Sequence, residues 1–334
     1  MVAARSVLIC GDGVAGYCCA HLLKKAGFEV VMERADRPRV PAIMLSQPAL
    51  DLLRDVFEKP QLFADQPRID WRVVAWGGEA AAAVSHTGVV VSEKTVLEQL
   101  AVPCAPPGDT PAAFTVYTAY PLPRTQTLRF GSRNAAAVKV ELKHPEDASA
   151  CQIETLEDGW LFLIPAPPAA WLLAVGGTPD QLLAKSRLIA PRIDLLGIRS
   201  GEFDACPRIV SPVCGEGWLA CGTVAMAVDP ICGDGTAQAV REAILASAAI
   251  KAIAGGGDAA AILAYYDARL TLAMYRHLGL CAEYYRTGGS SPWWQGELEA
   301  LLSGSEWCVE KLKAAGDPQF QLRGFDLLPY AAAS

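Results

Sequence analysis

The spacing of apolar residues at the start of the chain predicts two kinds of element in quick succession. Residues 7–10 form a short apolar run typical of a buried strand, and the residues after Gly16 follow a helical period that includes Leu22 and Leu23. A second apolar stretch, over 28–32, predicts another strand. The first 34 residues are therefore expected to fold as strand, helix and strand, the opening unit of a parallel α/β sheet.

Later segments alternate between the two patterns. We expect a helix over 49–57, strands over 71–76 and 89–91, and a loop over 101–125, where six prolines leave little periodicity. Consecutive short strands without intervening helices then favour an antiparallel sheet; they are 127–130, 136–142, 151–156, 160–164 and 171–175. A strand over 217–221 and a helix over 237–254 follow, and from 259 to the end a helical pattern is broken at 288–292.

Composition excludes several classes of protein. The 334 residues are 52% hydrophobic, which is enough for a large core. The net charge of −7, without a basic cluster, argues against a nucleic-acid partner. Because Asp12 and glycines break the apolar N-terminus, we expect no signal peptide, no membrane span and a cytoplasmic location.

Cysteine and histidine usage points away from disulfides and metals. The eleven cysteines are scattered without a C-x-x-C pair, so we expect small buried thiols in a reducing compartment. The four histidines are isolated in the sequence, and no metal site is expected.

The first glycine motif lies between the first predicted strand and helix. Gly11, Gly13 and Gly16 have the G-x-G-x-x-G spacing, and Glu33 ends the second strand 22 residues after Gly11. Glycines let a pyrophosphate approach the backbone at a helix N-terminus, and the acid can accept hydrogen bonds from a ribose. The basic residues Arg34, 37 and 39 could reach a phosphate or an adenine, or simply form a solvated loop.

The second glycine motif precedes the long helix predicted over 237–254. It spans 229–236 with the sequence Asp-Pro-Ile-Cys-Gly-Asp-Gly-Thr, and Gly233 and Gly235 permit close backbone approach. A helix N-terminus here would direct N–H groups at an anionic ligand edge. Taken alone, the motif is also compatible with an ordinary glycine-rich helix cap.

The two motifs together resemble a known family. The N-terminal G-D-G-V-A-G and the late D-P-x-x-G-x-G, with Gly-Trp-Leu-Phe-Leu-Ile-Pro over 159–165, are similar to the FAD-dependent hydroxylase superfamily of the p-hydroxybenzoate hydroxylase type, nearest its halogenase-like branch. The resemblance implies an α/β fold: an FAD/NAD(P)-binding, Rossmann-like three-layer lobe, an antiparallel substrate-side β-sheet and C-terminal helices. We assign 1–100 and 208–255 to the FAD-binding lobe, 125–207 to the sheet lobe and 256–334 to a helical segment.

The resemblance also implies which residues bind FAD. The first motif would hold the pyrophosphate, Glu33 the adenosine ribose, and the second motif the ribityl chain and flavin ring. No catalytic residue and no metal ligand is singled out. The predicted cofactor-binding residues are Gly11, Gly13, Val14, Ala15, Gly16, Glu33, Arg34, Gly222, Thr223, Asp229, Gly233, Gly235 and Thr236.

The chain departs from the family pattern at three places. Thr223 stands where the family usually has aspartate, and loss of that carboxylate is expected to weaken FAD binding. The lysine used by the family's halogenases is absent from 38–56, the nearest being Lys59, so halogenation is disfavoured. The chain is also shorter than its relatives, and no family strand is recognisable over 114–120.

From the resemblance we expect an FAD-dependent oxidoreductase of the monooxygenase type. It would hydroxylate a small organic or aromatic substrate through an oxygen adduct of the reduced flavin. Electrons would come from a separate flavin reductase or from NAD(P)H. Two alternatives remain: an FAD-dependent reductase or dehydrogenase of the geranylgeranyl-reductase-like branch, and a degenerate flavin-binding protein without catalysis.

Overall fold

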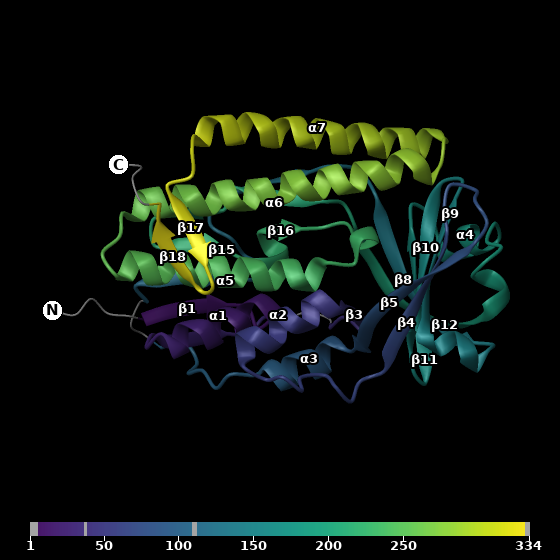
Figure 1. The fold of residues 1–334 in the computed structure, drawn as a ribbon, viewed down its shortest axis with the longest axis horizontal. Coiled ribbons are helices and arrows are strands. Elements are labelled where there is room, and N and C mark those ends of the chain that lie inside the picture. The colour runs from purple at the N-terminus through teal and green to yellow at the C-terminus, as the bar shows by residue number, and fades with distance from the viewer. Residues whose placement is uncertain (1–5, 37–38, 109–111, 331–334) are drawn as a thin grey trace.

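The computed structural model, which describes residues 6–36, 39–108 and 112–330, contains a mainly parallel sheet that lies on the left in Figure 1. The strand order is β14-β15-β6-β1-β2, and the last four of these strands run parallel. Strand β14 pairs antiparallel with β15 at one edge. The bounds are β1 (Ser6–Cys10), β2 (Glu29–Glu33), β6 (Phe114–Tyr117), β14 (Cys214–Gly215) and β15 (Trp218–Ala220).

Strand β6 corrects the prediction of a structureless loop over 101–125. Its four residues lie between β1 and β15, with Val116 pairing Ile9 on one side and Leu219 on the other. The prolines around it end the local periodicity, so the strand is defined by its two neighbours in the sheet rather than by its own sequence.

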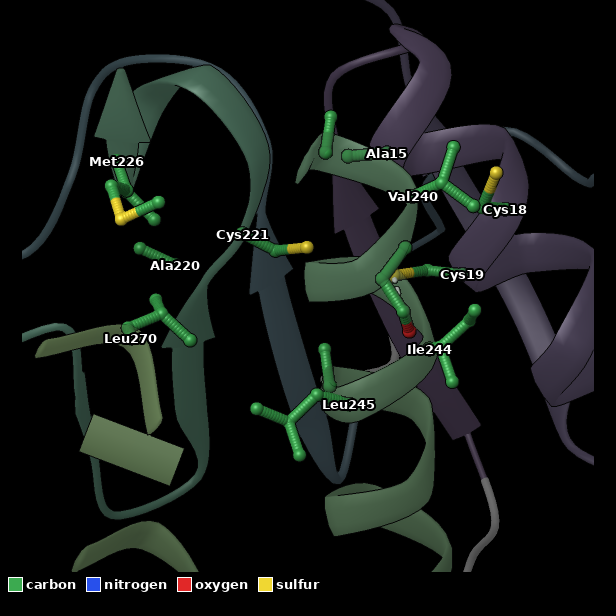
Figure 2. Close-up of a cluster of buried hydrophobic side chains, with 14 of the residues drawn as sticks. Ala15, Cys18, Cys19, Ala220, Cys221, Met226, Val240, Ile244, Leu245 and Leu270 are labelled. Carbon is green, nitrogen blue, oxygen red and sulfur yellow. Dashed lines mark hydrogen bonds between the residues drawn. The ribbon is translucent and has the colours of Figure 1, made fainter. Parts of the chain in front are cut away.

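The parallel sheet is the middle of three layers. Helices α1 (Val14–Lys25) and α5 (Gly235–Ala254) pack together on one of its faces. Figure 2 shows Cys19 of α1 beside Val240 and Ile244 of α5, whereas Met226 lies on the far side of β15. That side carries a small sheet of order β16-β13-β7, formed by β7 (Gln126–Arg129), β13 (Arg208–Ser211) and β16 (Met226–Ala227).

Cysteines fill the interface between the two helices. Cys18, Cys19 and Cys221 are fully buried, and the Cys19 thiol lies 3.7 Å from the carbonyl oxygen of Ala243. Small side chains at these positions let α1 and α5 approach each other and the sheet closely. All eleven cysteines are free thiols; seven are buried and four are half-buried.

The large sheet stands at one end of the molecule (Figure 1). Its order is β12-β8-β11-β10-β9-β4-β5-β3, antiparallel except for the β4–β9 pair. Four of the five strands predicted over 127–175 belong to it; the first, β7, joins the small sheet instead. The bounds are β3 (Ile43–Ser46), β4 (Arg68–Ala75), β5 (Ala82–Val91), β8 (Asn134–Leu142), β9 (Ala150–Leu156), β10 (Gly159–Ala166), β11 (Ala169–Val175) and β12 (Ile193–Asp204).

Strand pairing crosses the predicted lobe boundaries. Strands β3, β4 and β5 lie within the stretch 1–100, yet they pair with the large sheet and not with the parallel one. Short helices connect these elements: α2 (Gln47–Phe57), α3 (Glu93–Leu100) and α4 (Pro179–Leu183). The chain therefore passes from the parallel sheet to the large sheet and back twice.

Two long helices follow α5. Helices α6 (Ala259–Gly288) and α7 (Pro292–Ala315) lie side by side and extend toward the large sheet (Figure 1), and the predicted break at 288–292 separates them. The prediction of helix to the end is wrong beyond Ala315, because β17 (Phe320–Arg323) and β18 (Asp326–Pro329) form a hairpin that packs on α5. Within the described part of the chain, no helix combines the length and apolar character needed to span a bilayer.

Candidate functional site

The carboxyl ends of the parallel strands bring several predicted residues to one edge of the sheet. Gly11 follows β1, Glu33 ends β2, Thr118 follows β6 and Gly222 lies two residues after β15. Because these four strands run in the same direction, the segments that follow them meet at a single edge. Ligands of open α/β sheets bind at this kind of edge.

Glycines are sterically required at the first turn. Gly11 has φ +116°, and a Cβ atom there would lie 2.5 Å from Thr118 Oγ1. A Cβ on Gly16 would overlap the carbonyl oxygen of Gly11, so helix and strand could not pack as they do. Helix α1 begins after Gly13 without a capping side chain and without an acid in its first turn. Its first N–H groups are therefore available to an anionic ligand.

The second turn, at Gly222 and Thr223, touches the first. Gly222 has φ +74°, and a Cβ atom there would lie 2.7 Å from the Cβ of Ala15 in α1. Thr223 is exposed. The second turn therefore packs closely against the start of α1, more than 200 residues away in sequence.

A buried acid on α5 anchors the second turn. The backbone N–H of Gly222 donates to Glu242 Oε2 at 2.7 Å, and Gln238 donates to Oε1 at 3.1 Å. Burial raises the pKa of Glu242 to about 8. The two hydrogen bonds lower this pKa, but by less than burial raises it. At neutral pH the carboxyl group is mostly protonated, so it places little negative charge below the turn.

The acid within the first turn is neutralised by an ion pair. Asp12 is buried, and Arg39 Nη2 lies 2.7 Å from its Oδ2. Burial alone would raise the pKa of Asp12, but the hydrogen bond and charge of Arg39 outweigh it and the pKa is lowered. The basic loop thus folds back onto the glycine turn. Arg34 is exposed beside Glu33, whereas residue 37 lies outside the described residues.

The late motif forms the start of α5. Gly233 has φ +63° and ends the 3-10 helix η4 (Pro230–Cys232), and α5 begins at Gly235. The side chain of Asp234 does not cap α5 but pairs with Arg241 at 2.7 Å. This N-terminus, like that of α1, has no capping side chain, in contrast to α3 and α6, which are capped by Ser92 and Asp258.

The carboxylate of Asp229, one of the predicted cofactor-binding residues, has several protein partners. It is fully buried, and it accepts hydrogen bonds from Arg133 Nε at 2.8 Å, Tyr285 Oη at 3.0 Å and the N–H of Ile231 at 2.9 Å. Arg133 also pairs with the buried Glu297 of α7. This network joins the start of β8 to the late motif and to α6 and α7, so the Asp229 side chain holds the motif in place.

A cavity of about 830 Å³ adjoins the start of α5. Its wall includes Cys232, Gly233 and Asp234 of the late motif, side chains from the large sheet, and one face each of α5 and α6. The cationic side chains on the wall outnumber the acidic ones, and its charged and imidazole residues are Arg72, His86, Asp234, Arg241, Glu242, Arg269, Arg276 and His277. Burial and the charge of Arg72 lower the pKa of His86, so this imidazole is neutral near pH 7.

Sequence reasoning missed two groups of residues. Arg133 belongs to no motif, and nothing in its local sequence indicates burial. Cys232, His277 and Cys281 place three potential ligand atoms within 4.8 Å of one another. The His277-x-x-x-Cys281 spacing on a long predicted helix was the available signal, since residues four apart share a helix face.

The tryptophans near the large sheet are mainly structural. Trp160 and Trp294 are fully buried, and Trp160 Nε1 donates to Tyr285 Oη at 3.1 Å. Trp293 packs edge-on against Trp294 with ring centroids 4.8 Å apart.

No protein-family model and no curated protein matches the chain. Solved structures do match. The flavin-dependent halogenase CmlS aligns with a TM-score of 0.75 and 19% identity, covering 96% of this chain and 74% of that one. The myxobacterial chondrochloren halogenase CndH, an FAD-dependent halogenase, aligns with a TM-score of 0.71 and 14% identity. The alignment covers 96% of this chain and 98% of that one. The peptidyl tryptophan dihydroxylase QhpG aligns with a TM-score of 0.68 and 19% identity, covering 87% of this chain and 78% of that one.

These alignments show the fold of the chain. It has the architecture of the FAD-dependent halogenases and of the QhpG dihydroxylase. This confirms the predicted fold class and the predicted resemblance to the halogenase-like branch.

Proposed function

We propose that the protein binds FAD and acts as an FAD-dependent monooxygenase on a small organic substrate. The observation that carries this proposal is the contact between the two glycine turns at Ala15, next to the uncapped N-terminus of α1. A dinucleotide pyrophosphate needs close backbone approach, free N–H donors and low negative charge. Negative charge is low here because Asp12 pairs with Arg39 and because the pKa of Glu242 is raised.

The remaining predicted residues fit the same ligand. Gly13 and Val14 would donate N–H groups to the pyrophosphate, and Glu33, exposed at the end of β2, would bind the ribose with Arg34 nearby. The exposed hydroxyl of Thr223 would replace one hydrogen bond of the family carboxylate. Bound FAD would supply the redox chemistry, including activation of oxygen once it is reduced.

The N-terminus of α5 would bind the flavin ring of FAD. Gly233, Gly235 and Thr236 lie at this terminus, which lacks an acid in its first turn, so the helix dipole stabilises negative charge on a ligand edge. In this proposal the chain's own residues bind and orient the cofactor and the substrate, while the large sheet and α6 keep water from the reacting atoms.

The cavity lining supports a substrate with an acidic group. Arg72, Arg269 and Arg276 reach the wall from the large sheet and from α6, together with aliphatic residues such as Leu245 and Leu280. Guanidinium groups bind carboxylates bidentately, and the aliphatic part of the wall suits a carbon skeleton.

Halogenation is not part of the proposal. Among the described residues that line the cavity, none is a lysine. Lys59 Nζ donates to the carbonyl oxygen of Gln99 at 2.8 Å, at the end of α3 and away from the cavity. Reducing equivalents would come from a separate flavin reductase or from NAD(P)H.

Cofactor content tests the first half of the proposal. We expect the purified full-length protein to carry close to one FAD, released by heat and identified chromatographically. In Gly13→Val a branched side chain would stand where the phosphate must meet the backbone, and we expect FAD binding to be lost. The matched control is Gly279→Val, because Gly279 lies on α6 and a Cβ atom added there would meet open space, with no neighbouring atom within 4 Å. Absence of FAD together with no uptake on titration refutes the proposal, as does unchanged affinity in a folded Gly13→Val protein.

Oxygen labelling tests the second half. With FAD, a flavin reductase and candidate carboxylated aromatic substrates, we expect one ¹⁸O atom from ¹⁸O₂ in the product. Turnover that oxidises or reduces substrate without incorporating oxygen would instead support the reductase or dehydrogenase alternative.

A further inference from the structure

Two thiols and an imidazole meet at the wall of the cavity. Cys232 ends η4 within the late glycine motif, next to Gly233, and His277 and Cys281 are one helical turn apart on α6. The two sulfur atoms are 3.7 Å apart, and Cys281 Sγ is 3.3 Å from His277 Nε2. The proposed FAD and substrate contacts use none of these three side chains.

The two thiols differ in accessibility. Cys232 is half-buried and lines the cavity, whereas Cys281 is completely buried behind it. The hydrogen bond with Cys281, helped by His277, lowers the pKa of Cys232 to about 6 despite its burial. The same hydrogen bond and burial raise the pKa of Cys281. An accessible thiolate backed by a buried thiol is the arrangement of an attacking and a resolving cysteine.

A metal ion is the competing occupant of this cluster. The three ligand atoms lie within 4.8 Å of one another, which is close enough for a shared ion. However, His277 Nε2 already accepts a hydrogen bond from the backbone N–H of Asp229 at 2.8 Å, so its lone pair is engaged. Two sulfur ligands alone are fewer than a structural zinc site requires. The geometry therefore favours chemistry between the sulfurs.

We propose that Cys232 and Cys281 form a reversible redox pair that exchanges with small disulfides entering the cavity. The Cys232 thiolate attacks a disulfide RSSR, whose S–S bond breaks to release RS⁻. The Cys281 thiol passes its proton to that RS⁻, its sulfur attacks Cys232, and a second RS⁻ leaves. The two cysteines are thereby oxidised to one disulfide and RSSR is reduced to one RSH and one RS⁻.

Closing the bond requires little movement. The sulfurs must approach from 3.7 Å to about 2.05 Å, a change of less than about 2 Å. The new bond would tie η4, and with it the start of α5, to the C-terminal part of α6. Oxidation would thus change the cavity wall beside Gly233.

Thiol counting with oxidised glutathione tests the pair in the full-length protein. We expect the free thiols to fall from eleven to nine per chain, with a Cys232–Cys281 linked peptide on non-reducing mass mapping and recovery with dithiothreitol. Cys281→Ser should accumulate one glutathione on Cys232, because the resolving thiol is gone. Cys232→Ser should show neither product.

The matched control is Cys104→Ser. Cys104 is also half-buried but lies outside the cluster, and burial raises its pKa, so this variant should still lose two thiols. The proposal is overturned if glutathione adds equally to Cys232→Ser, if Cys281→Ser forms no adduct, or if the purified protein holds one tightly bound metal ion that either cysteine variant releases. These readouts do not depend on FAD, so this inference and the proposed function can fail separately.

Discussion

Replacing Glu242 by glutamine isolates the effect of a buried acid on stability. The folded-state pKa is about 8 and the ordinary value is 4.5, so between these pH values the folded chain keeps a proton that the unfolded chain has lost. The free energy of unfolding of the native protein must therefore fall as pH rises from about 4.5 to about 8, and this contribution is constant above that.

The size of the effect follows from the same two values. Each pH unit in the window lowers the free energy of unfolding by about 1.36 kcal/mol, which amounts to an effect on the order of 5 kcal/mol across the window. Glutamine has a similar shape and is uncharged at every pH, and its amide oxygen can still accept the N–H of Gly222. Glu242→Gln should match the native protein at pH 5 and exceed its stability at pH 8.5.

Urea unfolding followed by circular dichroism at both pH values, at one fixed FAD concentration, measures this difference. Glu310→Gln is the control, because Glu310 is exposed and pairs only at the surface with Lys313. It should follow the native protein at both pH values. If Glu242→Gln shows the same loss of stability between pH 5 and pH 8.5 as the native protein, Glu242 is not the buried acid responsible and the reasoning fails.

Three further predictions concern Thr223, Arg133 and the effect of halide ions. Thr223→Asp should tighten FAD binding by on the order of 1 kcal/mol, roughly fivefold in Kd by fluorescence titration, and weaker binding would mean that the turn has adapted to threonine. Arg133→Met leaves Asp229 and Glu297 buried without a counter-charge, so it should lower stability by about 3–5 kcal/mol in urea, whereas Lys185→Met, which breaks an exposed pair, should leave the unfolding midpoint nearly unchanged. Adding bromide or chloride during turnover should leave the product mass unchanged, because the lysine used by the family's halogenases is absent from 38–56. A halogenated product would show that this prediction is wrong.

Local sequence predicted those parts of the fold that depend on neighbouring residues. The strand, turn and helix around Gly11–Gly16 follow from a short apolar run, glycine spacing and a helical period, and all lie within 34 residues. Strand β6 was missed because only its neighbours β1 and β15 define it. The hairpin over 320–329 was missed because it lies beyond a long helical pattern, on the surface of α5.

The candidate site divides in the same way. The glycine turns could be located from spacing, since close backbone approach demands glycine. The partners of Asp229 could not, because Arg133 and Tyr285 are 96 and 56 residues away in sequence and meet it only through the packing of β8 and α6. Cys281 likewise reaches Cys232 across 49 residues.

The place of β6 in the parallel sheet also governs the order in which this chain can fold during synthesis. Strands β1 and β2 emerge early, but β15, which covers the other edge of β6, follows about 200 residues later. Until then the ribosome-bound chain carries an unfinished sheet with an open apolar edge, which invites pairing with other nascent chains. Completion of the sheet therefore waits for β15, and the edge of β6 stays open to wrong pairing while the strands of the large sheet are made.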